Sequence, residues 1–319
     1  YRCFANQTSK MTVHQTPSAT ETGFATRVNA GFTNYMAFTS LSAYSSLTGD
    51  RFFFYQGIEG TNTSDFALGT TNAKTFTISF WAYSSLTGTH SGCVQNNNTD
   101  RSYVFTYTIS AANTWEYKTI TISGDQTGTW LTSSAGAGIY VSFNLGVGST
   151  YLTSTTNAWQ AGYYIGATGS QSIVGTNGAT FYITGVQLEK GSTATSFDFR
   201  SYGTELALCQ RYFETYALNN TSLIGTTTSS TSGSAVLQWR TAKRAAPTIT
   251  LPSAGQTSGT VSFLTSTGGY PSATGTHTTP DVTVDKATIL SSGSSGLTSG
   301  GVSIFWSNGT STISISAEL

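Results

Sequence analysis

Aromatic side chains repeat at every second position in two segments of the chain, where they could bind sugars. Trp81 and Tyr83 have this spacing, and Trp115 and Tyr117 repeat it. The flat face of an aromatic ring packs against the C–H face of a sugar ring, while polar neighbours bind the hydroxyls. The alternative is that the rings fill the core or a subunit contact. The candidate ligand-binding residues are Trp81, Tyr83, Trp115, Tyr117, Trp130 and Trp159, with Tyr163 and Tyr164 as further candidates.

Groups that could break a covalent bond do not form a recognisable pattern. Glycoside hydrolysis needs two carboxyl groups facing across a cleft, about 5–9.5 Å apart, which a sequence does not reveal. We interpret Asp198 with Arg200, and Glu205 with Arg211, as structural ion pairs. A GxSxG motif is absent, and the three histidines are scattered along the sequence. We therefore expect no enzyme and no catalytic residues.

Metal and cofactor sites have equally little support in the sequence. The chain contains no CxxC or HExxH motif. Its three cysteines, Cys3, Cys93 and Cys209, are too few for a disulfide framework. We expect them to be buried or half-buried free thiols in a protein made in a reducing cytosol. We expect no cofactor and no metal; a structural Ca²⁺ held by Asp and backbone oxygens is an alternative for which the sequence nominates no ligands.

The composition favours a β-protein that meets its partners through hydroxyl and aromatic groups. Only 9% of the residues are charged and 13% are aromatic, whereas an ordinary globular protein has about 25% charged residues. The formal net charge is zero, so we expect no nucleic-acid partner. No apolar run approaches the ~18 residues of a membrane-spanning helix, so we expect no membrane insertion. The sequence begins at Tyr1 rather than Met, and we expect further sequence before it.

Short segments, in which residues for the two faces of a strand alternate, must position these side chains, and turn residues separate the segments. They predict an all-β fold with many strands. Only residues 205–216 suggest a helix, with Thr204 as its cap and Leu206, Cys209, Phe213 and Tyr216 on one stripe. Segments rich in Gly, Ser, Thr and Asn at 87–99, 167–178 and 221–233 are predicted loops. The predicted strands are 51–56, 74–83, 103–109, 115–122, 138–145, 180–188, 235–240, 247–251, 260–264, 281–284, 301–306 and 312–317.

The middle of the chain resembles a segment that recurs in bacteriophage virion proteins, chiefly tail-fibre and appendage proteins of marine phages. Residues 185–192 read GVQLEKGS, 195–198 read TSFD and 202–213 read YGTELALCQRYF. Phe213 stands where the family usually has a second Tyr. Residues 76–83 and 114–130 are similar to carbohydrate-binding jelly rolls in such proteins, and residues 244–248 and 316–319 are similar to the family's C-terminal part.

The resemblance implies a two-layer β-sandwich, exposure on a virion and trimeric assembly. Together with the pattern of strands and helix it leads us to expect an N-terminal jelly-roll β-sandwich, a short helical connector and a smaller C-terminal β-sandwich. We place the jelly-roll domain at 1–200, the connector at 201–220 and the C-terminal β-domain at 221–319. The expected protein is a non-enzymatic virion subunit of a tail fibre or appendage, assembled in the bacterial host cytoplasm. Its expected partners are its own copies in a homotrimer, other virion proteins and a host-surface glycan, bound weakly at several sites.

Three other functions stay open at this stage. The first is a capsid-attached fibre or decoration protein, which differs in its position on the particle. The second is a polysaccharide depolymerase, which would need a facing pair of carboxyl groups. The third is a secreted bacterial adhesin. Fold-level resemblance alone does not separate them, because one β-sandwich fold hosts many functions.

Overall fold

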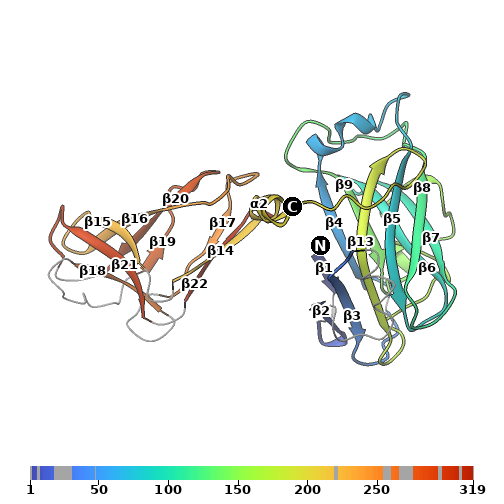
Figure 1. The fold of residues 1–319 in the computed structure, drawn as a ribbon, viewed down its shortest axis with the longest axis horizontal. Helices are drawn as coiled ribbons and strands as arrows, with labels where there is room; N and C mark the ends of the chain where they lie inside the picture. Colours follow the sequence, from blue (N-terminus) through green and yellow to red (C-terminus); the bar gives the residue numbers. More distant parts are fainter. Residues whose placement is uncertain are drawn as a thin grey trace. The chain divides into compact units, whose positions relative to one another are not determined.

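A computed structural model of the chain divides into two compact units, Tyr1–Asp198 and Phe199–Leu319. Each unit is described separately below (Figure 1). Among the described residues, no helix combines the length and the apolar character needed to cross a membrane. The structure describes residues 2–5, 8–17, 31–46, 48–218, 222–253, 260–265, 276–293, 297–308 and 311–318.

Two antiparallel sheets face each other in the N-terminal unit (Figure 1). The first has the order β1-β4-β9-β6-β7-β11, and the second has the order β2-β3-β13-β5-β8. The strands of the first sheet are β1 (Arg2–Ala5), β4 (Phe52–Glu59), β9 (Ala137–Asn144), β6 (Gly88–Asn96), β7 (Arg101–Ile109) and β11 (Trp159–Ala161). Those of the second are β2 (Met11–Pro17), β3 (Asn34–Ser40), β13 (Thr180–Lys190), β5 (Phe76–Ser84) and β8 (Glu116–Ile122).

Smaller elements complete this unit. Strands β10 (Leu152–Thr153) and β12 (Gly166–Ala167) form a short parallel pair. The 3₁₀ turns are η1 (Thr8–Lys10), η3 (Gly60–Asn62), η4 (Ser64–Phe66) and η5 (Ser149–Tyr151).

The core of the N-terminal unit lies between the two sheets, where alternate residues of each strand meet. On β5, Phe76, Ile78 and Phe80 are fully buried, as the alternation of 74–83 predicts. Phe54 and Phe143 of the opposite sheet stack at 5.0 Å between ring centres. A layer this rich in aromatic rings excludes water from both inner faces and stabilises the sandwich.

The prediction of a loop at 87–99 is wrong, because most of this segment forms the central strand β6. The strand reads GTHSGCVQN and contains two glycines and an asparagine, which are depleted in strands. Its small side chains are needed, since a Cβ on Gly92 would lie 2.4 Å from Phe105 Cζ and 2.5 Å from the Ser142 carbonyl oxygen. Packing of large rings on β7 therefore overrides the local propensity.

The C-terminal unit is a second β-sandwich with its own apolar core. Buried Ile313 and Ile315 of the three-stranded sheet pack with buried Phe305 of the six-stranded sheet. The smaller sheet consists of β14 (Phe213–Ala217), β22 (Thr312–Ser316) and β17 (Thr248–Thr250). The larger has the order β18 (Thr260–Thr265), β21 (Val302–Asn308), β15 (Ser222–Thr227), β16 (Ser232–Gln238), β20 (Lys286–Ser292) and β19 (Thr276–Thr278).

The predicted helix at 205–216 is misplaced. Helix α2 spans Tyr202–Gln210, and Ser201 rather than Thr204 caps it, with its side chain accepting a hydrogen bond from Thr204 N. Phe213 and Tyr216 belong to β14, which pairs with β22. The stripe through these two residues therefore does not exist, because pairing with a distant strand ends the helix.

Two further predictions on the C-terminal unit are wrong. Residues 221–233, predicted as a loop, contain β15 and the start of β16, which pair with each other as a hairpin. Residues 281–284 form only an isolated bridge at Val282, and the strand follows as β20. Threonine is β-branched and suits a strand, so a Ser/Thr-rich composition does not by itself mark a loop.

The expected fold class is confirmed. The protein is all-β, with an N-terminal jelly-roll sandwich, a short helix and a smaller C-terminal β-sandwich. The domain limits 1–200, 201–220 and 221–319 stay a prediction. Of the cysteines, Cys93 is a buried free thiol, whereas Cys209 is exposed and corrects the expectation of burial. The side chain of Cys3 lies outside the described residues.

Candidate functional site

Six aromatic residues gather on the outer surface of the sheet β2-β3-β13-β5-β8. The inward positions of β5 belong to the core, so Trp81 and Tyr83 point to the other face. Strand pairing places Trp81 opposite Tyr117 of β8 and Tyr83 opposite Tyr182 of β13. We call this surface the aromatic face; it consists of Tyr35, Trp81, Tyr83, Trp115, Tyr117 and Tyr182.

The rings of the aromatic face hold one another in place. Tyr83 and Tyr182 stack at 4.8 Å between ring centres, with planes 7° apart. Trp115 lies 5.5 Å from Tyr83, and Tyr35 lies 5.7 Å from Trp115. Such offset and edge contacts are each worth about 0.5–1.5 kcal/mol beyond burial. The network therefore fixes the ring positions before any ligand arrives.

The exposed fraction of the side chain differs among the six rings of the aromatic face, so only some of them can contact a ligand. Trp115 and Tyr35 are only 5% and 3% exposed, so they offer little surface to a ligand and act by packing against Tyr83 and Tyr182. Tyr117 is 45% exposed, and Trp81, Tyr83 and Tyr182 are half-buried. The four accessible rings come from three neighbouring strands, β13, β5 and β8.

Hydrogen-bonding groups border the accessible rings. Tyr83 Oη donates to Asn113 Oδ1 at 3.3 Å. Further along β13, Gln187 Nε2 and Thr195 Oγ1 donate to the carboxylate of Glu189. Burial alone would raise the pKa of Glu189, but these hydrogen bonds outweigh it and lower the pKa. The carboxylate is therefore ionised at neutral pH and fixed near the end of β13, where Glu189 pairs with Thr77 of β5.

The edge strand β8 carries charged residues on its inward side. Lys118 Nζ lies 2.5 Å from Glu116 Oε2, and each side chain is 16% exposed. Glu116 Oε1 also accepts hydrogen bonds from the backbone N–H groups of Ser110 and Ala111. Charges on an edge strand discourage pairing with strands of other molecules. The sheet therefore offers side-chain rings rather than a free backbone edge as its contact surface.

Trp130 and Trp159 do not join the aromatic face. Their rings meet edge to face at 5.3 Å, and both pack against the main core. Their indole N–H groups donate to backbone carbonyls, that of Trp159 to Ser123 at 2.6 Å and that of Trp130 to Thr127 at 3.1 Å. These contacts give the two tryptophans a structural position that the sequence does not distinguish from a binding one.

The further candidates Tyr163 and Tyr164 also lie away from the aromatic face. Tyr163 packs against Tyr151 at 5.3 Å between ring centres. Tyr164 packs on a small buried cluster around Cys93 and Val104. Tyr163 therefore belongs to local packing of the 150–170 segment, whereas Tyr164 packs this segment against β6 and β7.

Tyr35 and Tyr182 are the two members of the aromatic face that the sequence candidates lack. Tyr182 lies between Phe181 and Ile183, which are both buried in the core. The alternation of 180–188 implies that it faces outward, so the signal was available. Tyr35 had no comparable signal, because the rings that it contacts, Trp115 and Tyr182, are distant in sequence.

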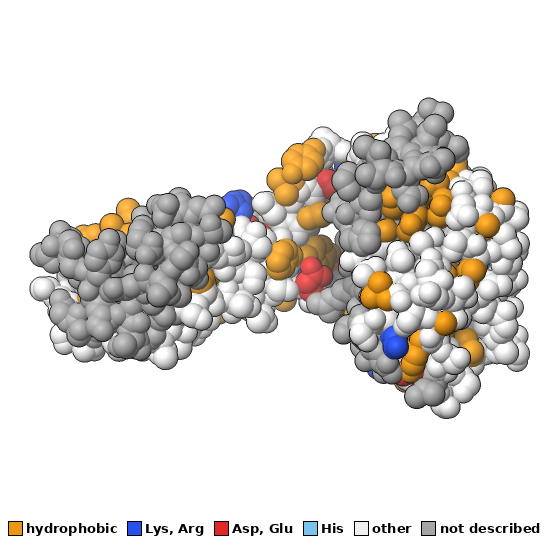
Figure 2. Space-filling model, turned by 90° about the horizontal axis from the view of Figure 1, so that it is seen from below, with side chains coloured by type: hydrophobic (Ala, Val, Ile, Leu, Met, Phe, Trp, Pro, Cys, Tyr) orange, Lys and Arg blue, Asp and Glu red, His pale blue; other side chains and the backbone are white. Residues whose placement is uncertain are grey.

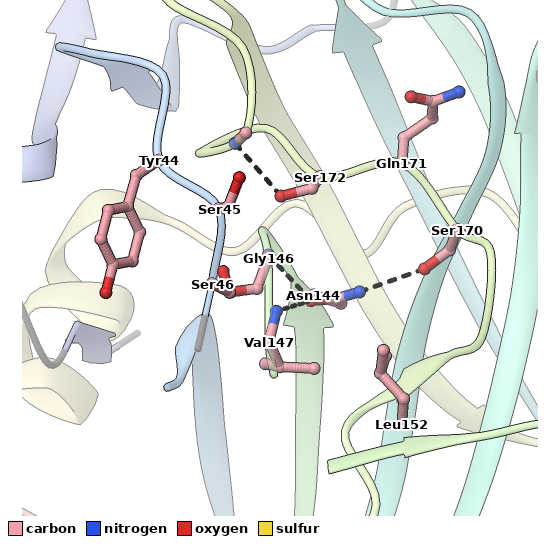
Figure 3. A pocket seen from close by; sticks show the side chains of 11 residues that line it. Tyr44, Ser45, Ser46, Asn144, Gly146, Val147, Leu152, Ser170, Gln171 and Ser172 are labelled. Carbon is pink, nitrogen blue, oxygen red and sulfur yellow. Dashed lines mark hydrogen bonds between the residues drawn. The ribbon is translucent and has the colours of Figure 1, made fainter. Parts of the chain in front are cut away.

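A separate pocket of about 290 Å³ opens at one end of the N-terminal sandwich. Figure 3 shows it between residues 44–46 and the loop 170–172, with Asn144 between them. The lining is uncharged and consists of Tyr44, Ser45, Ser46, Asn144, Gly146, Val147, Leu152, Ser170, Gln171, Ser172 and Gly175.

Several carboxylates are engaged in ion pairs rather than facing one another. Asp125 forms two hydrogen bonds with Arg101, at 2.7 and 2.8 Å. Buried Glu214 lies 3.1 Å from Lys243, and Glu205 lies 3.7 Å from Arg200. Within the described part of the chain, no group of three His, Cys, Asp or Glu side chains could hold a metal ion.

The visible surface in Figure 2 carries few charged side chains, in keeping with the composition. A ligand contact on such a surface depends on rings, hydroxyls and amides. Long-range electrostatic attraction contributes little to it.

No family model and no curated protein matches the chain. Among solved structures it is similar to TmCBM61 in complex with β-1,4-galactotriose, at 10% identity over 60% of this chain and 88% of that one, with a TM-score of 0.28. A family 11 carbohydrate-binding module from Clostridium thermocellum, in complex with a β-1,3-1,4-mixed-linked tetrasaccharide, gives 12% identity, coverage of 61% and 90%, and a TM-score of 0.27. The enzymatically active domain of bacteriophage CBA120 tailspike protein 4 is 12% identical over 57% of this chain and 20% of that one, with a TM-score of 0.28. At TM-scores this low these likenesses carry no argument about function.

Proposed function

We propose that the N-terminal unit binds a host-surface glycan through the aromatic face, and that the protein is a non-enzymatic subunit of a phage tail fibre or appendage. The aromatic face carries this proposal. Four accessible rings lie on three adjacent strands and are held by two buried ones. An arrangement of rings on a sheet suits an extended ligand such as a polysaccharide chain, because each sugar ring can pack against an aromatic ring.

The expected single-site affinity is low. The rings offer flat contact area, but the face is open, so a bound sugar keeps much of its surface in water. Several copies on one particle raise the overall affinity without a stronger site, provided that they engage simultaneously. A homotrimer in a fibre would supply such copies and would bury surface that carries little charge.

Support for the virion role comes from the segment 185–213 and its resemblance to phage appendage proteins. The two described free thiols fit assembly in a bacterial cytoplasm before release of the particle. The proposed partners are further copies of the chain and other virion proteins. Locating the chain on an intact particle by labelled antibody separates a tail appendage from a capsid-attached fibre.

The experiment is a titration of purified host-surface polysaccharide into the protein by calorimetry. Trp81→Ala and Tyr117→Ala should each weaken binding about tenfold or more, as loss of a central aromatic contact does. Tyr202→Ala is the matched control, because this tyrosine is 81% exposed and lies on α2 in the other unit. Equal affinity of all four proteins would refute the role of the aromatic face.

The same incubation tests the non-enzymatic part of the proposal. We expect no new reducing ends after prolonged contact between protein and polysaccharide. Release of reducing ends would show a depolymerase, with a facing carboxyl pair to be sought. Binding and cleavage are measured separately, so either half of the proposal can fail alone.

A further inference from the structure

The pocket at the end of the N-terminal sandwich is a site separate from the aromatic face and shares no residue with it. Its walls come from residues 44–46, which follow β3, and from the loops 145–152 and 170–175. In Figure 3 the hydroxyl groups of Ser45 and Ser172 point toward each other across the opening. The pocket is therefore lined by polar groups from segments far apart in sequence.

The floor of the pocket is fixed by a hydrogen-bond network around Asn144. Its side-chain oxygen accepts from Gly146 N at 2.9 Å and Val147 N at 3.1 Å. Its amide nitrogen donates to Ser91 Oγ and Ser170 Oγ, both at 3.2 Å. Asn144 itself is only 4% exposed. A buried and fully bonded amide of this kind holds the floor in one conformation before ligand binding.

Glycine at position 146 is needed for this shape. Gly146 has a φ of 141°, and a Cβ there would lie 2.4 Å from Val174 Cγ1 and 2.6 Å from Ser172 Oγ. Any side chain would push the 172–174 loop away from the floor. The side chains of Ser172 and Val174 thus pack directly against the backbone at Gly146.

One hydroxyl group in the lining is left for a ligand. The hydroxyl of Ser45 forms no hydrogen bond with any described residue, whereas the hydroxyl of Ser46 donates to the Gly146 carbonyl at 3.0 Å. The carboxamide of Gln171 points away from Asn144 in Figure 3, toward Gly88. A hydroxyl can both donate and accept, which matches the hydroxyl groups of a sugar. Val147 and Leu152 supply an apolar part of the wall for C–H groups.

The lining contains no charged side chain, and this sets the charge of the ligand. The nearby charged groups lie outside it: Asp50 Oδ2 accepts from Tyr44 Oη at 2.6 Å, and Lys10 Nζ lies 5.5 Å from the centre of the Tyr44 ring. Moving an ionised group into an uncharged pocket is costly unless it is paired. A neutral ligand avoids that cost.

We propose that this pocket binds one uncharged sugar unit. The volume of about 290 Å³ lies at the lower end of small-molecule pockets, which span ~300–1,000 Å³. It suits a single ring rather than a chain, and the end of a glycan could enter it. The aromatic face would then bind the extended chain of a polysaccharide, and the pocket would bind one sugar unit at its end.

The test is ligand-observed NMR with the full chain and single monosaccharides. D-glucose, D-galactose and D-mannose are the neutral probes, D-glucuronate is the charged probe, and glycerol tests for a small polyol alone. At least one neutral sugar should bind in the millimolar range, more tightly than glucuronate and glycerol. Ser45→Ala should weaken it about fivefold, as expected for loss of one hydrogen bond, and Ser45→Trp should abolish it by filling the opening.

Ser45 is exposed, so its substitution should leave the fold intact, which circular dichroism checks. Tyr117→Ala should leave monosaccharide binding unchanged, and Ser45→Ala should leave the aromatic contribution to polysaccharide binding unchanged. The two measurements therefore show separately whether the pocket binds a monosaccharide and whether the aromatic face binds the polysaccharide. Absence of binding by every neutral sugar, equal binding of glucuronate or glycerol, or binding unaffected by both pocket variants would overturn the proposal.

Discussion

Tyr83 and Tyr182 lie face to face on neighbouring strands, with ring centres 4.8 Å apart and planes 7° apart. The two residues are almost a hundred positions apart in sequence, and only the pairing of β5 with β13 brings them together. Their contact joins the rings of β5 and β8 to those of β13 and β3. The aromatic face is therefore continuous through this pair, and the contacts of Trp115 with Tyr35 and Tyr182 join the same strands a second time.

Removing one ring of the pair should weaken both folding and binding. Tyr182→Ala should lower the free energy of unfolding by about 1–3 kcal/mol, since a half-buried ring and its stacking are lost. It should also weaken polysaccharide binding, because Tyr83 loses its support. Tyr182→Phe keeps the ring and should keep the affinity. Urea denaturation and calorimetry measure the two effects, and an affinity drop in Tyr182→Phe equal to that in Tyr182→Ala would contradict the supporting role.

The ion pair between Arg101 and Asp125 should be important for stability. Asp125 is 3% exposed and accepts two hydrogen bonds from Arg101 and one from the hydroxyl of Thr127. Asp125→Asn should destabilise the protein by roughly 3–5 kcal/mol, because it leaves a guanidinium without its charged partner. Asp65→Asn is the control; its pair with Lys190 is half-exposed and should be worth ~0–1 kcal/mol. Similar midpoints of urea denaturation for the two variants would refute this ranking.

Gly92 on the central strand β6 should tolerate no side chain. A Cβ would collide with the Phe105 ring and with the Ser142 backbone oxygen, so Gly92→Ala should cost about 1–3 kcal/mol or more through overpacking. Gly49→Ala is the control, since nothing lies within 4 Å of its Cβ position. Thermal unfolding of the two variants checks the prediction. A melting temperature for Gly92→Ala equal to that of wild type would show that the strand can move aside.

His90 should make stability depend on pH. Burial lowers its pKa below 6.5, nearby Lys118 lowers it further, and a hydrogen bond to the Leu86 carbonyl opposes the shift. Protonation would put an N–H at Nδ1, a buried atom without a hydrogen-bond partner among the described residues. The unfolded chain therefore binds the proton more readily, and stability falls as pH drops through 6.5 toward the lowered pKa.

The measurement for His90 is the free energy of unfolding between pH 7.5 and 5, compared with that of His90→Phe. The variant keeps a ring against Tyr107, which stacks with His90 at 5.7 Å between ring centres. Wild type should lose stability over this range while the variant loses less, because the carboxylates titrate in both. Identical slopes for the two proteins would contradict the assignment to His90.

Local pattern predicted the strands that build the core but not the segments shaped by distant contacts. The alternation of 74–83 placed Trp81 and Tyr83 outward, because an inward residue at every second position follows from strand geometry. By contrast β6 reads as a loop, since its small residues are explained only by the rings of β7 above Gly92. Helix α2 ends where β14 pairs with β22, which no local signal reveals.

The candidate site shows the same limit. Trp115 and Tyr117 could be located from their spacing, whereas Trp130 has no spacing that separates a core position from a surface one. Its indole N–H bond to the Thr127 carbonyl becomes visible only in three dimensions. The pocket was not foreseeable either, because its lining comes from three segments that meet only in the fold.

Glycan binding on the aromatic face can be tested residue by residue with hydroxyl-radical footprinting, which reports the exposure of each aromatic side chain with and without polysaccharide. We expect polysaccharide to lower the labelling of Trp81, Tyr83 and Tyr117. Labelling of Tyr202 on α2 should stay unchanged. Unchanged labelling of the three rings at a polysaccharide concentration that saturates binding would contradict the assignment of glycan binding to the aromatic face.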